Sequence, residues 1–125
     1  MIYAGQLNIN VIRANFVDDK DAFGKMDPYI AIKIGQNEFR TKIANGAGKT
    51  PSWNETFTCF INGEQNLELS AFDDDHGKDE LIGKDTISLA QVFQQRNVTM
   101  DFPVYDKKHE HEGTVTLNLA FNPTR

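Results

Sequence analysis

Hydrophobic and polar residues alternate with a period of two along most of the chain. In the first such segment, Leu7, Ile9 and Val11 alternate with Asn8 and Asn10. Successive side chains of a β-strand point to opposite faces, so this pattern predicts half-buried antiparallel strands with one face on a core. The pattern holds in the segments 7–11, 30–34, 57–61, 67–71 and 115–121, and weaker strand candidates are 39–43, 81–89 and 102–105.

Turn-forming residues, mostly glycine and asparagine, separate these segments. About eight short strands with turns between them predict an all-β fold of the β-sandwich type. Residues 88–93 are expected to form one short helix with Ser88 as its N-cap. The chain has 125 residues and shows no repeat, linker or low-complexity tract, so we expect a single domain over residues 1–125.

Acidic residues gather in two places, each where a predicted strand meets a loop. The first cluster lies within residues 18–27 and the second within residues 73–80. Crowded carboxylates repel one another, so stability alone does not explain these clusters. A hard cation such as Ca2+, which is bound by several oxygen ligands, does explain them. Solvated acidic loops are the alternative for either cluster alone, and the presence of both favours a site.

The strand pattern indicates which acidic side chains can meet. Asp27 precedes Pro28, which favours an extended backbone and places Asp27 at the mouth of a strand, with Asp21 across the preceding loop. Asp73 ends the strand 67–72, and Asp75 points to the same side. The intervening aspartate offers at most its backbone carbonyl.

The candidate ligands form an all-oxygen set, which suits Ca2+ and not Zn2+. They are the side chains of Asp21, Asp27, Asp73, Asp75 and either Asp79 or Glu80, with the backbone carbonyls of Lys20 and Asp74. An EF-hand is excluded, because a loop that starts at Asp73 would need an acceptor and a glutamate where Gly77 and Lys84 stand.

Three motifs of this chain resemble those of the C2 domain family. Residues 24–29, Gly-Lys-Met-Asp-Pro-Tyr, resemble its Gly-x-Ser-Asp-Pro-Tyr signature, and residues 51–57 resemble its Pro-x-Trp-Asn-Glu-x-Phe. Residues 72–75, followed by 81–83, resemble the signature of its third loop. The chain is most similar to small stand-alone C2 proteins of the plant elicitor-responsive kind. The resemblance implies an eight-stranded antiparallel Greek-key β-sandwich of type II topology.

The resemblance also implies a function, which is Ca2+-dependent binding to anionic phospholipid membranes with two or three ions held by Asp21, Asp27, Asp73 and Asp75. For the last ligand, alignment on Gly83 favours Glu80, whereas loop geometry equally allows Asp79. Phe23, at the expected tip of the first loop, would insert into the bilayer unless it packs under its own loop. A basic strand face binds phosphoinositides in the family. Its counterparts here, Lys33, Arg40 and Lys42, form a weak patch for which a solvated face is favoured.

Composition narrows the remaining classes of function. The net charge of −5 argues against nucleic acid as a partner. Cys59 lies in an apolar strand pattern and is expected to be a small buried hydrophobe. The stretch 109–112 alternates histidine and glutamate, and an exposed loop is favoured there over a metal site. No leader or membrane-spanning pattern is present, so we expect a cytoplasmic signalling protein that moves to membranes as a peripheral protein.

Two competing functions remain in view. The first is a protein-interaction adaptor of the same fold, in which calcium is structural or absent. The second is an enzyme, but the sequence shows no Ser-His-Asp, Cys-His or phosphate-loop pattern, so no enzymatic activity is expected.

Overall fold

The structure is a computed structural model and describes residues 2–18 and 25–124. Strands dominate the described part of the chain, as the alternating pattern predicted. In chain order the elements are β1 (Ala4–Phe16), β2 (Pro28–Ile34), β3 (Asn37–Arg40), β4 (Ser52–Asn62), β5 (Asn66–Asp73), β6 (Glu80–Ser88), α1 (Ala90–Gln95), β7 (Asn97–Tyr105) and β8 (His111–Pro123).

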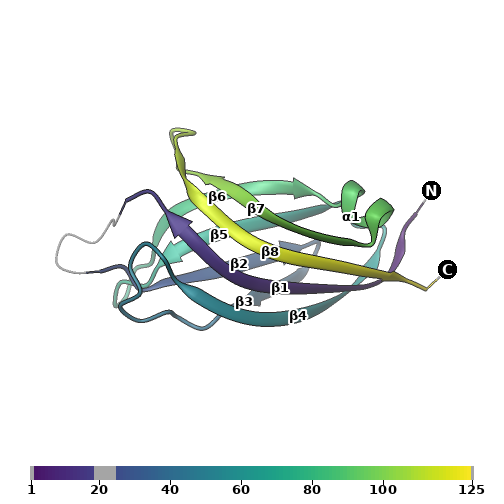
Figure 1. Cartoon of the computed structure of the whole chain (residues 1–125), viewed down its shortest axis with the longest axis horizontal. Helices are drawn as coiled ribbons and strands as arrows, with labels where there is room; N and C mark the ends of the chain where they lie inside the picture. The colour runs from purple at the N-terminus through teal and green to yellow at the C-terminus, as the bar shows by residue number, and fades with distance from the viewer. Residues whose placement is uncertain (1, 19–24, 125) are drawn as a thin grey trace.

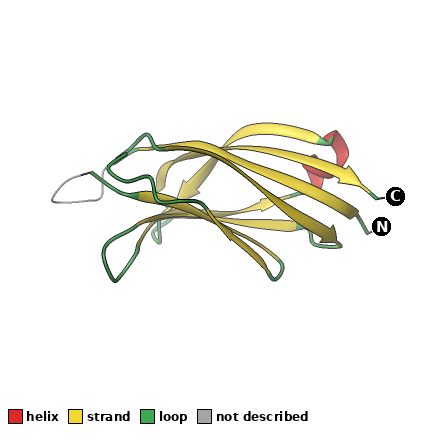
Figure 2. Cartoon of the chain, turned by 90° about the horizontal axis from the view of Figure 1, so that it is seen from below, coloured by secondary structure: helices red, strands yellow, loops and turns green. Residues whose placement is uncertain are grey.

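The strands form two antiparallel layers (Figures 1 and 2). Their hydrogen-bonded order is β3-β2-β5-β6-β7-β8-β1-β4. Between β6 and β7 the pairing narrows to Lys84 opposite Tyr105, so β3-β2-β5-β6 make one layer and β7-β8-β1-β4 make the other. The predicted eight-stranded antiparallel β-sandwich is confirmed.

The core lies between the two layers and follows from the period-two pattern. Leu7, Ile9 and Val11 of β1 are fully buried, as are Leu117 and Leu119 of the neighbouring strand β8. Each side chain of this kind stabilises the folded state by about 1.5–3 kcal/mol when it leaves water. Cys59 is buried as expected.

Two element boundaries differ from the prediction. Strand β3 ends at Arg40, because the hydroxyl of Thr41 accepts the N–H of Ile30 at 2.9 Å in place of a ladder carbonyl. Helix α1 has Leu89 as its N-cap, so the expectation of Ser88 as the cap is wrong. Ser88 stays in β6, where it pairs with Asn66.

Four connections meet at one end of the sandwich, which we call the loop end. It comprises residues 17–27, 41–51, 74–79 and 106–110. Antiparallel pairing brings them together, since Pro28 lies opposite Asp73 and Phe16 opposite Gly113. Helix α1 and both ends of the chain lie at the opposite end (Figure 1). Among the described residues, no helix has the length and hydrophobicity needed to span a membrane.

Candidate functional site

Asp27 and Asp73 are in direct contact at the loop end. The backbone N–H of Asp27 donates to Oδ1 of Asp73 at 2.8 Å, and the N–H of Asp74 donates to the carbonyl of Asp27 at 2.9 Å. Asp73 is only 3% exposed, and Asp27 is half-buried. The structure therefore brings together one aspartate from each of the two acidic clusters.

The carboxylate of Asp27 also ties the first loop to the connection 41–51. Its Oδ1 accepts the N–H of Gly46 at 2.6 Å. Two backbone bonds hold the same connection, from Gly48 to the carbonyl of Met26 at 3.0 Å and from Ala44 to the carbonyl of Pro28 at 2.8 Å. One aspartate thus organises three segments of the loop end.

Asp74 and Asp75 occupy the start of the connection 74–79. Asp75 is exposed, and its carbonyl accepts the N–H of Lys78 at 2.8 Å, which closes a turn around Gly77. The charge of Asp74 contributes to raising the pKa of Tyr29. Its side chain therefore faces the outer surface of β2.

Asp79 lies on that same outer surface, where the hydroxyl of Tyr29 donates to its carboxylate. Burial, and then this hydrogen bond, raise the pKa of Tyr29 to about 12. The same bond is the main cause of the lowered pKa of Asp79. The guanidinium of Arg40 lies over the Tyr29 ring, 4.3 Å from its centroid. Asp79 is thus held by groups outside the acidic clusters.

Glu80 points elsewhere. It pairs with Asp73 in the β5–β6 register and is exposed. Together with Asp18 at the end of β1, it lines an open cleft that the connection 106–110 completes. Adjacent positions on an extended chain face opposite sides, which explains why Asp79 and Glu80 diverge.

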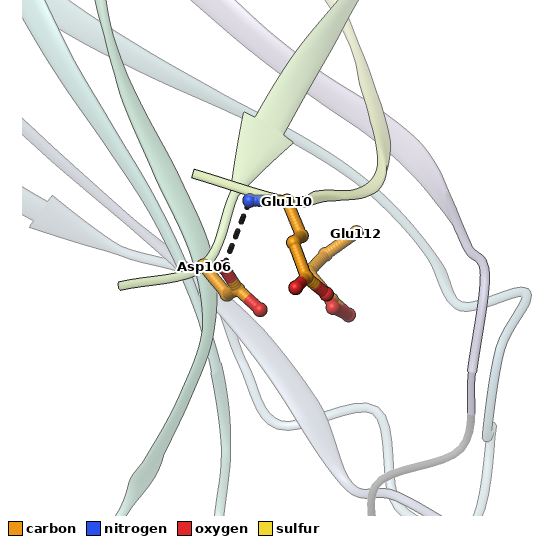
Figure 3. A group of neighbouring side chains, drawn as sticks. All are labelled: Asp106, Glu110 and Glu112. Carbon is orange, nitrogen blue, oxygen red and sulfur yellow. Dashed lines mark hydrogen bonds between the residues drawn. The ribbon is translucent and has the colours of Figure 1, made fainter. Parts of the chain in front are cut away.

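The cleft also holds an acidic trio that the sequence analysis missed (Figure 3). Asp106, Glu110 and Glu112 each bring one carboxylate oxygen within 4.8 Å of the others. Glu112 is 5% exposed, so this end of the stretch 109–112 is not the exposed loop that we expected. The usable signal was Asp106, because an aspartate that caps a short turn brings the residues after the turn back to itself. Carboxylates at such distances are common without an ion, so the trio is assigned no metal.

The basic residues expected on the outer face of β2 and β3 are only partly grouped. Lys33 lies opposite Glu38 on β3 and opposite Glu68 on β5, which offset its charge. Arg40 shares that face, whereas Lys42 follows the end of β3 and donates its backbone N–H to Glu55 at 2.9 Å. The patch is therefore mixed in charge, in line with the solvated face that the sequence favoured. Three further candidates, Lys20, Asp21 and Phe23, lie outside the described residues.

Comparison with known proteins identifies the class of protein that this fold and site define. The profile of the C2 domain family matches residues 5–104, so the chain belongs to the C2 domain family. It is 31% identical to 16 kDa phloem protein 2 of Arabidopsis thaliana, over 96% of this chain and 83% of that protein. It is 29% identical to elicitor-responsive protein 3 of Oryza sativa subsp. japonica, over 95% of this chain and 84% of that protein.

Solved structures give the same result. A C2 domain-containing protein from a putative elicitor-responsive gene superposes with a TM-score of 0.84 at 30% identity, covering 98% of this chain and 92% of that one. A calcium-bound structure of the two tandem C2 domains of extended synaptotagmin 2 superposes with a TM-score of 0.83 at 28% identity, covering 95% of this chain and 46% of that one. The predicted resemblance to elicitor-responsive C2 proteins is confirmed.

Proposed function

We propose that this protein is a single C2 domain that binds anionic phospholipid membranes through its loop end in a Ca2+-dependent manner. The supporting observation is the contact between Asp27 and Asp73, which unites two acidic loops from distant parts of the sequence. Burying a carboxylate beside another is costly unless a cation or hydrogen bonds compensate. The donor atoms at this position are oxygens, as Ca2+ requires.

The proposed ligands follow from where each side chain lies. Asp27, Asp73 and Asp75 would hold two or three ions, together with Asp21 and the carbonyls of Lys20 and Asp74. For the last carboxylate we favour Glu80 over Asp79. The Tyr29 hydroxyl already engages Asp79 on the outer face of β2, whereas Glu80 pairs with Asp73 in the strand register.

The residues of the chain prepare the loop end for this role. Asp27 fixes the spacing of three loop segments by accepting the N–H of Gly46 and donating its own N–H to Asp73. When bound, Ca2+ would supply positive charge and coordination positions for headgroup oxygens. Phe23 is proposed as a membrane contact. The proposal describes a cytoplasmic, non-enzymatic peripheral protein that does not bind nucleic acid.

Calcium-dependent co-sedimentation with vesicles tests this function. The vesicles contain phosphatidylcholine with or without phosphatidylserine, and each is tested in calcium and in chelator. The native chain should sediment with phosphatidylserine vesicles only in calcium, and the variant D27N/D73N should remain in solution. Glu68→Gln is the matched control, since Glu68 is an exposed acid on the same strand as Asp73. Equal binding of the native chain in calcium and in chelator would refute the proposal and leave the adaptor function as the better account.

A further inference from the structure

We propose that the turn between β7 and β8, residues 106–110, is an additional membrane contact that binds anionic lipid headgroups through Lys107 and Lys108. The inference rests on the proposed membrane function. It adds a contact outside the two acidic loops. We call these five residues the β7–β8 turn.

The β7–β8 turn stands beside the roots of both acidic loops. The N–H of Val17 donates to the carbonyl of Glu112 at 2.8 Å, directly after the β1–β8 ladder. Gly113 packs so closely that an added Cβ would lie 2.3 Å from the carbonyl oxygen of Asn15. The cleft beside the turn is shared with Asp18 and Glu80. A membrane that faces the acidic loops would therefore also face this turn.

Hydrogen bonds hold the turn in one shape. The carboxylate of Asp106 accepts the N–H groups of Lys108 at 2.8 Å and of Glu110 at 2.9 Å. The backbone of Asp106 bonds to the carbonyl of Glu110 at 2.9 Å and to the N–H of His109 at 3.0 Å. His109 adopts a φ of 62°, which reverses the chain. Lys107 and Lys108 are thereby presented at an exposed tip whose backbone is already ordered.

The charges around the tip indicate an anionic occupant that arrives together with calcium. Within residues 2–18 and 25–124, neither lysine forms an ion pair, so both ammonium groups remain available. The acidic trio and Glu80 lie behind them and oppose the approach of a polyanion such as nucleic acid. A phospholipid surface is favoured, because it can also engage the neighbouring acidic loops once calcium offsets their charge. Each lysine near an anionic surface then contributes about five-fold in affinity.

A charge-matched pair of variants tests the proposal. K107Q/K108Q removes the two tip charges, and R13Q/R96Q removes two exposed charges elsewhere, on the outer side of β1 and after α1. Binding to phosphatidylserine vesicles in saturating calcium should weaken about ten- to thirty-fold for K107Q/K108Q. It should change about two-fold or less for R13Q/R96Q. Calorimetric calcium affinity without lipid should match the native value in both.

A dye placed on the turn gives an independent readout. His109→Cys, labelled with a polarity-sensitive dye, should show a blue shift on vesicle binding, and Gln94→Cys on α1 at the opposite end should not. Cys59 is buried and protected from the label. If the native chain binds in calcium while K107Q/K108Q binds like the control and the dye at 109 is unchanged, this proposal is refuted and the membrane function stands. If the native chain fails to bind at all, the proposed function itself is refuted.

Discussion

Replacing Asp73 by asparagine tests the calcium site with little disturbance of the fold. Asp73 is 3% exposed, and its Oδ1 accepts the N–H of Asp27 at 2.8 Å. Asparagine retains an acceptor oxygen in the same place but loses the charge. A hydrogen bond to a charged group contributes about 1 kcal/mol more than a neutral one, and relief of carboxylate repulsion offsets part of this loss. In chelator, the free energy of unfolding should therefore change by about 1 kcal/mol or less.

Calcium should separate the variant from the native chain. A ligand at one hundred times its dissociation constant stabilises the folded state by about 2.7 kcal/mol. A chain of 125 residues has an unfolding entropy of about 0.26 kcal/mol per kelvin. Calcium should thus raise the native midpoint by about 10 °C. Loss of one carboxylate ligand should weaken calcium binding about a hundred-fold, so that at the same concentration the rise for Asp73→Asn falls to about 1.5 °C.

Thermal unfolding followed by circular dichroism, with and without calcium, measures both quantities. Glu68→Gln is the control, since it makes the same charge change on β5 but away from the loop end. It should keep the full calcium-induced rise. An Asp73→Asn variant that also keeps this rise would show that Asp73 is not a ligand.

Three further predictions concern the surroundings of the site. Tyr29→Phe should lose a contribution to stability that is complete below pH 10.0 and disappears as the pH rises toward the Tyr29 pKa of about 12; urea unfolding across this range measures it. Gly113→Ala should destabilise the fold by about 4 kcal/mol or more, because its Cβ would overlap the backbone of β1, whereas Gly46→Ala, with open space but a φ of 68°, should cost about 1 kcal/mol in the same assay. Glu80→Gln should weaken calorimetric calcium affinity about ten-fold or more and Asp79→Asn about three-fold or less, and the reverse order would assign the ligand to Asp79.

The sequence predicted the parts of the fold that depend on local patterning. Alternation alone identified strands such as β1 and β8, because burial of one face imposes a period of two on any half-buried strand. The end of β3 was not predictable in this way, since it depends on the Thr41 hydroxyl, which replaces a ladder carbonyl for Ile30. The β-sandwich followed from the number and spacing of strands, whereas its type II topology came from the resemblance to C2 domains.

The site was predictable to the same extent. Strand ends indicated that Asp27 and Asp73 would meet, and the structure places them in contact. The choice between Asp79 and Glu80 could not be made from the sequence, because it depends on a hydroxyl that Tyr29 contributes from another strand. The acidic trio was missed for a related reason, since Glu112 meets Asp106 only after the turn has closed.

The placement of both ends of the chain opposite the loop end has a practical consequence. β1 runs for 13 residues from Ala4 to Phe16, which is about 43 Å at the rise of an extended strand. A fluorescent protein fused to either end would then be carried on the far side of the domain, away from a bilayer that contacts the loops (Figure 1). Energy transfer from such a fusion to a dye in the lipid would be weak even for a fully bound protein, whereas a donor on the β7–β8 turn would transfer efficiently.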